Sequence, residues 1–98
     1  MFCYRVFTAS DDVMLAVCDA SLIGKTITEG DLSISVHHDF YGTQMCDEHK
    51  LEPLVEKATI INAIGESIIT YLKKKKYIEE SGIRWISGVP HAQIITIV

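Results

Sequence analysis

The stretch Thr59-Ile60-Ile61-Asn62-Ala63-Ile64-Gly65-Glu66 decides the fold of this chain, because its residues are compatible with two different structures. Apolar residues recur at helical spacing through the stretch and on both sides of it, which fits one long helix over residues 53–76. The β-branched run and the glycine at its end favour instead a short buried strand, followed by a helix that begins near Glu66. We predict the strand, which adds one member to the sheet.

Two further strands are expected upstream. Residues 2–7 are rich in aromatic and β-branched residues, and residues 13–19 are almost wholly apolar. The polar turn Ser10-Asp11-Asp12 between them indicates an antiparallel hairpin, because short polar side chains can bond their own backbone in turns. The second strand is apolar on both faces and is therefore expected at the centre of the sheet.

The segment between this hairpin and the deciding stretch holds one clear strand. Residues 32–37 alternate between apolar and polar side chains, which is typical of a half-exposed strand. Residues 20–30 are expected to form a connection, and residues 38–43 a loop. A helix is expected from about Leu51 to Ala58, because Pro53 is tolerated best in the first helical turn.

Downstream, residues 66–76 form a helix under either interpretation, and its four closing lysines suit the negative end of the helix dipole. Residues 83–87 are expected to form a short strand. Gly88-Val89-Pro90 is expected to turn, and residues 91–98 to form an apolar C-terminal strand.

These elements predict one small domain of α/β or α+β class spanning residues 1–98. Its mixed or antiparallel sheet contains the N-terminal hairpin and the C-terminal strand, with one or two helices packed on it. The chain has 98 residues, of which 48% are hydrophobic and 22% charged. That composition supplies enough apolar surface for a folded core and argues against intrinsic disorder.

The sequence shows no pattern typical of a targeting or membrane segment. No apolar stretch of about 18 residues is free of charge, and Asp11-Asp12 interrupts the short apolar N-terminus, unlike a signal peptide. The three cysteines, Cys3, Cys18 and Cys46, are irregularly spaced and do not suggest a disulfide framework. We expect a cytoplasmic protein without a cofactor and without a membrane partner.

Charge is distributed unevenly along the chain. The net charge of −4 argues against a dedicated duplex-DNA binder. Residues 1–49 carry two basic and eight acidic side chains, whereas residues 50–98 carry seven and five. The candidates for contact with nucleic acid are in the second half: Lys73, Lys74, Lys75, Lys76 and Arg84. A solvated helix end is the competing explanation of the lysine run. Tyr41 and Trp85 are candidates for exposed aromatic residues that stack on a base.

A second set of polar residues suggests a ligand site. A proline fixes the backbone before the C-terminal strand, so that His91 and Gln93 share one face of it. Asn62, Gly65 and Glu66 lie at the entry to a helix, where free backbone N–H groups could receive an anion. The imidazole could act there as a general base. These side chains could equally satisfy polar groups at the end of the sheet.

A zinc site is a weaker alternative, formed by His37, His38, Cys46 and His49, because zinc favours nitrogen and sulfur ligands. No second regular pair completes a standard zinc motif, so an exposed polar loop is the simpler interpretation. Cys46 and His49 could also act as nucleophile and base. The two acidic residues between them oppose the positive environment that a reactive thiolate needs.

Several short motifs occur in an order that resembles a known family. They are Leu15-Ala16-Val17-Cys18-Asp19, Leu22-Ile23-Gly24-Lys25, Phe40-Tyr41-Gly42, Asn62 with Gly65-Glu66, and Gly88-Val89-Pro90-His91-Ala92-Gln93. The set resembles the archaeal family called domain of unknown function 424 over nearly the whole chain. The resemblance implies a cytoplasmic, single-domain archaeal protein, and members of this family are often encoded near translation genes. The lysine run is denser than the family pattern and does not anchor a family-wide function.

The resulting hypothesis is a non-enzymatic binding module that works with the translation apparatus and binds RNA or protein. Its expected partners are ribosomal, tRNA or translation-factor components. The alternative is a small ligand-binding or enzymatic domain centred on His91, Gln93, Asn62 and Glu66. That alternative requires the four side chains to line one pocket.

Overall fold

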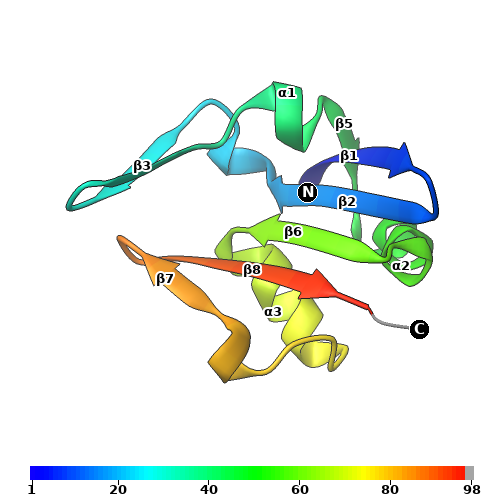
Figure 1. The fold of residues 1–98 in the computed structure, drawn as a ribbon. Helices are drawn as coiled ribbons and strands as arrows, with labels where there is room; N and C mark the ends of the chain where they lie inside the picture. Colours follow the sequence, from blue (N-terminus) through cyan, green and yellow to red (C-terminus); the bar gives the residue numbers. More distant parts are fainter. Residues whose placement is uncertain (97–98) are drawn as a thin grey trace.

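The computed structural model describes residues 1–96 and has an α+β architecture (Figure 1). A central sheet has six strands in the order β5-β1-β2-β6-β8-β7, and β3 pairs with β4 in a separate two-stranded sheet. In chain order the elements are β1 (Phe2–Ala9), β2 (Asp12–Asp19), the 3-10 turn η1 (Ala20–Leu22), β3 (Thr26–Glu29), β4 (Leu32–Ser35), α1 (His38–Tyr41), β5 (Gln44–Cys46), α2 (Glu48–Lys57), β6 (Ile60–Ile64), α3 (Glu66–Lys74), the 3-10 turn η2 (Glu80–Gly82), β7 (Arg84–Ile86) and β8 (Val89–Ile95).

The deciding stretch forms strand β6, which confirms the prediction. Thr59, the residue before it, bonds to Val13 in both directions. Its N–H donates to the Val13 carbonyl at 2.8 Å, and its hydroxyl accepts from the Val13 N–H at 2.9 Å. These bonds lie next to the parallel pairing of β6 with β2. Gly65 then adopts a φ of 127°, which lets the chain turn into α3. Both faces of β6 carry apolar side chains, so its pattern also resembles that of a helix.

The N-terminal hairpin is also confirmed. β1 and β2 pair antiparallel over their full length, from Phe2 opposite Asp19 to Ala9 opposite Asp12. β2 lies between β1 and β6, in the interior of the sheet, as its apolar sequence predicts. Its residues 15–18 are fully buried because both of its faces are covered along that part.

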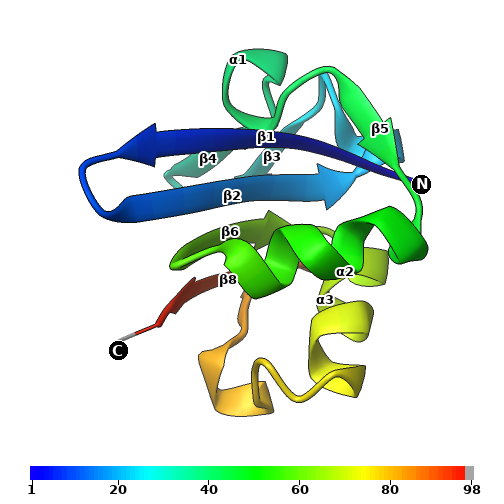
Figure 2. The same cartoon turned by 90° about the vertical axis from the view of Figure 1, so that its right-hand side faces the viewer.

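Helices α2 and α3 cover one face of the central sheet (Figures 1 and 2). The strand side chains beneath them, Leu15, Val17, Ile61, Ala63 and Ala92, are at most 3% exposed. The helices contribute the other half of this core, which includes Leu51, Val55, Ile68, Ile69 and Leu72. Most of the apolar burial that stabilises the protein is therefore on this side.

The described part of the chain covers the opposite face only at one end. There the β3–β4 hairpin and α1 lie over the sheet (Figure 1), and Ile27 and Tyr41 belong to a second core cluster with Ile64. The Ser87 N–H also donates to a carboxylate oxygen of Glu29 at 2.8 Å, which ties the hairpin to the turn before β8. Within residues 1–96, no helix or hairpin covers the rest of this face.

The predicted start of the helix at about Leu51 is wrong for α2. The helix begins at Glu48 rather than near Leu51, because the carboxylate of Asp47 accepts a hydrogen bond from the Lys50 N–H at 3.0 Å and caps it. Pro53 therefore lies inside the helix, beyond its first turn. The exposed proline lacks one helical N–H donor, and the helix, capped by Asp47 and packed through Leu51 and Val55, tolerates that loss.

Four short elements differ from the expected connections. Residues 20–30 contain η1 and β3, residues 38–43 contain the single-turn helix α1, and β5 precedes α2. Each of these elements has three or four residues, which is too short to show a hydrophobic period.

Towards the C-terminus, strand β8 begins at Val89. Pro90 therefore lies within the strand rather than in a turn, and its carbonyl accepts from the Gly65 N–H at 2.9 Å. The final two residues of the predicted C-terminal strand lie outside the described residues. No helix in the described chain is long and apolar enough to cross a membrane.

Candidate functional site

Two adjacent strand pairs bring four of the predicted site residues onto one face of the sheet. Residues directly opposite each other in antiparallel strands point to the same side. Asn62 of β6 lies opposite Gln93 of β8, and His91 of β8 lies opposite Arg84 of β7. Because His91 and Gln93 are two residues apart on one strand, all four side chains share a face.

This is the face that α2 and α3 leave uncovered. Its residues are half-buried or exposed, whereas their neighbours that point to the helices are largely buried. We refer to it as the open face and define it by the side chains that alternate onto it from β2, β6, β7 and β8: Met14, Ile60, Asn62, Arg84, His91, Gln93 and Ile95.

The two amides give the open face its hydrogen-bonding capacity. Asn62 Nδ2 lies 3.3 Å from the sulfur of Met14, which is only a weak acceptor. Gln93 is exposed beside it. An amide side chain offers both donors and acceptors, so this pair can bond a planar polar group placed on the sheet.

His91 adds a neutral imidazole to the same face. Burial lowers the pKa of its ring below the ordinary value of 6.5, and the positive charge of Arg84 lowers it further. The ring is therefore neutral at pH 7, with one nitrogen as donor and the other as acceptor. This state suits recognition of a polar ligand as well as proton abstraction.

Apolar side chains that the sequence analysis did not single out border these polar groups. Ile60 lies opposite Ile95, which is 62% exposed. On the β1 side, Phe7 stacks on Phe40 with ring centroids 5.7 Å apart, and the Arg5 guanidinium lies 4.6 Å from the Phe7 centroid. Alternation within each strand could have indicated a shared face, but only strand pairing shows that these residues are adjacent.

Gly65 and Glu66 lie outside the open face, at the start of α3. The backbone N–H groups at the start of α3 are already occupied, because the Asp19 carboxylate accepts from Ser67 N–H and Ile68 N–H, both at 2.9 Å. A Cβ on Gly65 would lie 2.4 Å from the carboxyl carbon of Asp19, so glycine permits this close approach. The protein's own carboxylate thus fills the position that an anion would take.

Glu66 does not share its cavity with the other residues that the enzymatic alternative requires. It lines a cavity of about 160 Å³ together with Asp19 and Pro90 at the end of the strands. The amide and imidazole side chains of the open face do not line that cavity.

The predicted nucleic-acid residues are divided between two surfaces. Arg84 is on the open face, whereas the lysine run is at the C-terminal end of α3. Lys73 forms an ion pair with Glu80. The Lys75 ammonium lies over the Tyr71 ring, 5.9 Å from its centroid. Part of the lysine run is therefore engaged within the fold.

Of the two aromatic residues predicted to be exposed, the prediction is wrong for Tyr41. Tyr41 is only 4% exposed, and burial, with a smaller contribution from Cys18, raises the pKa of its hydroxyl to about 12. It anchors α1 to the sheet and is not a stacking surface. Trp85 is 52% exposed, as predicted, at the edge strand β7.

The predicted zinc ligands are not assembled as a set of four. Cys46 is buried on the helix-covered side with Leu51 and Val55, whereas His37 and His38 lie beside α1 near the opposite face. His49 is in the first turn of α2. The group that faces these two adjacent histidines is instead the carboxylate of Asp39.

The cysteines have the properties of buried structural thiols. All three are free and buried. Burial and then the charge of Asp47 raise the pKa of the Cys46 thiol, and burial raises that of Cys18 to about 12. These thiols are protonated at pH 7, which does not favour Cys46 as a nucleophile.

Together, these features define a small α+β protein whose mixed sheet is covered by helices on one side and carries polar residues on the other. Residues 7–97 match the model of the family described as "Protein of unknown function (DUF424)". The match spans most of the chain, so the protein belongs to the DUF424 family, as its motifs predicted.

A solved structure has a similar fold. It is the crystal structure of an uncharacterized conserved protein from Methanopyrus kandleri, with a TM-score of 0.79 and 23% sequence identity. The alignment covers 99% of this chain and 94% of that one. At this identity the likeness concerns the fold. No curated protein matches the chain.

Proposed function

We propose that this protein is a non-enzymatic, cytoplasmic binding module of the archaeal translation apparatus and that it holds single-stranded RNA on its open face. One observation carries the proposal: strand register places Asn62, Gln93, His91 and Arg84 side by side on an uncovered sheet surface. Sequence-specific RNA recognition targets unpaired bases, whose edges bond polar side chains and whose rings stack on flat ones.

The chemistry of the open face fits such a ligand. The two amides can pair with the donor and acceptor groups at a base edge, and the neutral His91 ring can add one bond of either kind. The guanidinium of Arg84 presents several donors in a fork that suits phosphate. Phe7 and Phe40 at the margin provide apolar ring surface next to Arg5.

Two features support binding rather than catalysis. All three thiols are buried, and burial raises the pKa of Cys18 and Cys46, which makes these two poor nucleophiles at pH 7. Two carboxylates at the start of α3 have other environments: Asp19 caps the helix, and Glu66 lines a cavity that the open-face side chains do not line. His91 is therefore left without an acidic partner from the original candidate set.

The link to translation rests on the genes near which family members are often found, and the Methanopyrus kandleri neighbour agrees with an archaeal source. The net charge of −4 implies modest electrostatic attraction to RNA. Local contacts on the open face then contribute most of the affinity, and binding depends less steeply on salt than for a basic protein.

Fluorescence anisotropy with labelled single-stranded RNA and with bulk tRNA, at about 50 and about 200 mM salt, tests the proposal. We expect saturable binding, weakened roughly tenfold in the double variant Arg84→Ala/Gln93→Ala. The control is Lys57→Ala/Gln44→Ala, which removes one exposed cation and one exposed amide. Lys57 ends α2, and Gln44 lies opposite Tyr4, on the helix-covered side.

A third variant, Lys74→Ala/Lys75→Ala/Lys76→Ala, separates the open face from the lysine run. Loss of binding in this variant, with full binding in the open-face variant, would move the RNA site to α3. Absence of saturable binding to either RNA at the lower salt would overturn the RNA proposal and leave a protein partner as the interpretation of the open face.

A further inference from the structure

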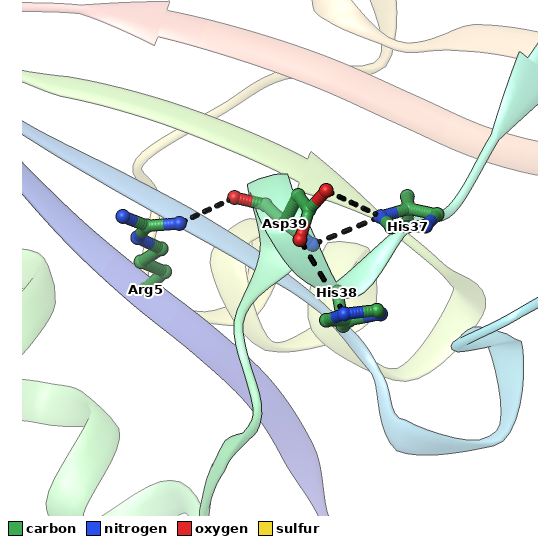
Figure 3. A network of polar contacts seen from close by, with 4 residues as sticks. All are labelled: Arg5, His37, His38 and Asp39. Atoms are coloured by element: carbon green, nitrogen blue, oxygen red, sulfur yellow. Dashed lines mark hydrogen bonds and ion pairs between the residues drawn. The ribbon is translucent and has the colours of Figure 1, made fainter.

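His37, His38 and Asp39 are consecutive in sequence, and their side chains converge (Figure 3). Neighbouring residues in a strand point to opposite faces. Here the chain changes from extended backbone at His37, with φ −99° and ψ 143°, to the first helical residue of α1 at His38. This change places the two imidazole rings on one side, stacked with centroids 4.3 Å apart.

The Asp39 carboxylate faces both rings. Its Oδ2 lies 3.4 Å from His37 Nδ1, and its Oδ1 lies 3.4 Å from His38 Nε2. A tetrahedral ion with bonds of about 2.0–2.1 Å holds its ligand atoms about 3.4 Å apart. One ligand atom from each of the three residues lies within 4.8 Å of the others, and all three side chains are exposed. Small side-chain rotations therefore suffice to bring three ligands onto one ion.

The backbone that carries this group is fastened to the sheet. Arg5 Nη1 of β1 donates to the backbone carbonyl of Asp39 at 2.6 Å (Figure 3). The arginine binds this carbonyl and, among the described residues, forms no ion pair with the carboxylate, whose oxygens face the two imidazole rings instead. Tyr41, the last residue of α1, is buried. A Cβ on Gly42 would lie 2.1 Å from the Tyr4 carbonyl oxygen, which shows how closely the loop approaches β1.

The group also borders open space. His38 and Asp39 line a cavity of about 460 Å³, together with Arg5, Thr43 and Gln44. An ion held by three protein ligands at this margin would retain a coordination position for water or for a small ligand. The cavity is separate from the side chains that define the open face.

We propose that His37, His38 and Asp39 form a binding site for a divalent transition-metal ion of the zinc class. Two imidazoles and one carboxylate suit zinc, nickel or cobalt, whereas calcium and magnesium prefer more oxygen ligands. The Nδ1 of His37 accepts from the Asp39 N–H at 3.1 Å, so this nitrogen carries no proton and has the lone pair that a metal requires. Metal binding replaces that hydrogen bond. The inference is independent of RNA binding.

Isothermal titration calorimetry of the tag-free, chelator-treated full chain with ZnCl₂ tests the site. We expect one zinc per chain with a dissociation constant of about 10 µM or tighter. His38→Ala and Asp39→Asn should each weaken binding at least about tenfold, because each removes one of three ligands. His49→Ala is the matched control, since it removes an exposed histidine outside the group. Cobalt provides a second readout through the visible absorption of a coordinated ion.

The three variants alter exposed side chains, and urea unfolding verifies that each remains folded. Two results would overturn the proposal. One is no saturable uptake of zinc or cobalt by the wild-type chain. The other is binding by a folded His37→Ala/His38→Ala variant that equals the wild type, which would place the metal elsewhere.

Discussion

The two faces of the central sheet differ in what covers them and in the side chains that they carry. Under α2 and α3 the strands present Leu15, Val17 and Ile61, all nearly inaccessible to solvent. The open face presents Asn62 of β6 and Gln93 of β8, which are half-buried and exposed. The covered face stabilises the fold through apolar burial, whereas the open face can vary its chemistry with little effect on stability.

The comparison predicts that the largest losses of folding stability come from substitutions in the core beneath α2 and α3. Leu72 of α3 is fully buried, and Leu72→Ala should lower the free energy of unfolding by about 2–5 kcal/mol, because it removes apolar contacts and leaves a cavity. Ile95→Ala on the open face should change it by about 0.5 kcal/mol or less. Urea unfolding followed by circular dichroism measures both variants.

An Ile95→Ala variant as unstable as Leu72→Ala would contradict this comparison. The open face would then be covered in solution. Dependence of the unfolding midpoint on protein concentration would identify the cover as a second copy of the chain.

A smaller loss of folding stability is expected from substitution of Asp19, which joins α3 to the sheet. Asp19 ends β2 and bonds two N–H groups at the start of α3. Asp19→Ala should cost about 0.5–2 kcal/mol, as for other lost helix caps, and Asp19→Asn should cost less because it retains one oxygen acceptor. Asp31→Ala, an exposed aspartate in the β3–β4 turn, is the control. Equal costs for positions 19 and 31 would show that the cap does not hold α3 to the sheet.

The smallest expected effect is the dependence of folding stability on pH that arises from His91 of the open face. The pKa of His91 is lower in the folded chain than its ordinary value of 6.5, mainly through burial and then through Arg84. Below that value the unfolded chain binds more protons, so this contribution to stability is present above about pH 6.5 and is lost as the pH falls.

Thermal unfolding measured between about pH 5 and pH 7.5 checks the sign. We expect Tm to fall on acidification and the slope to become shallower in His91→Asn. Arg84→Ala should reduce the slope only in part, because burial remains. An unchanged slope in His91→Asn would mean that the imidazole titrates equally in the folded and unfolded chains.

Local patterns were sufficient for the longer elements. Apolar and β-branched composition indicated β1, β2 and β6, and amphipathic spacing with closing lysines indicated α3. A cap outweighed the local rule at α2, because Asp47 satisfies backbone donors and fixes the start of the helix five positions before Pro53. The elements β3, β5 and α1 are too short to show a period, and pairing or packing with distant residues stabilises them.

The candidate site was predictable only in part. Polar residues at alternating positions indicated that His91 and Gln93 share a face, but their neighbours come from other strands. Asn62 joins them through pairing with β8, and Arg84 through pairing with β7. Glu66 lies only four residues after Asn62 in the sequence, yet after the turn at Gly65 it lines a cavity that the open-face side chains do not line.

The sequence by itself indicated the family through the order of its short motifs. It also indicated one domain of α/β or α+β class with a strand within residues 59–64, because composition and periodicity are properties of neighbouring residues. The tertiary structure decided which face of the sheet remained open and which carboxylate occupied the start of α3. Those outcomes depend on register and on contacts between residues distant in the chain. Such contacts form only when the burial of apolar side chains brings the strands and helices together.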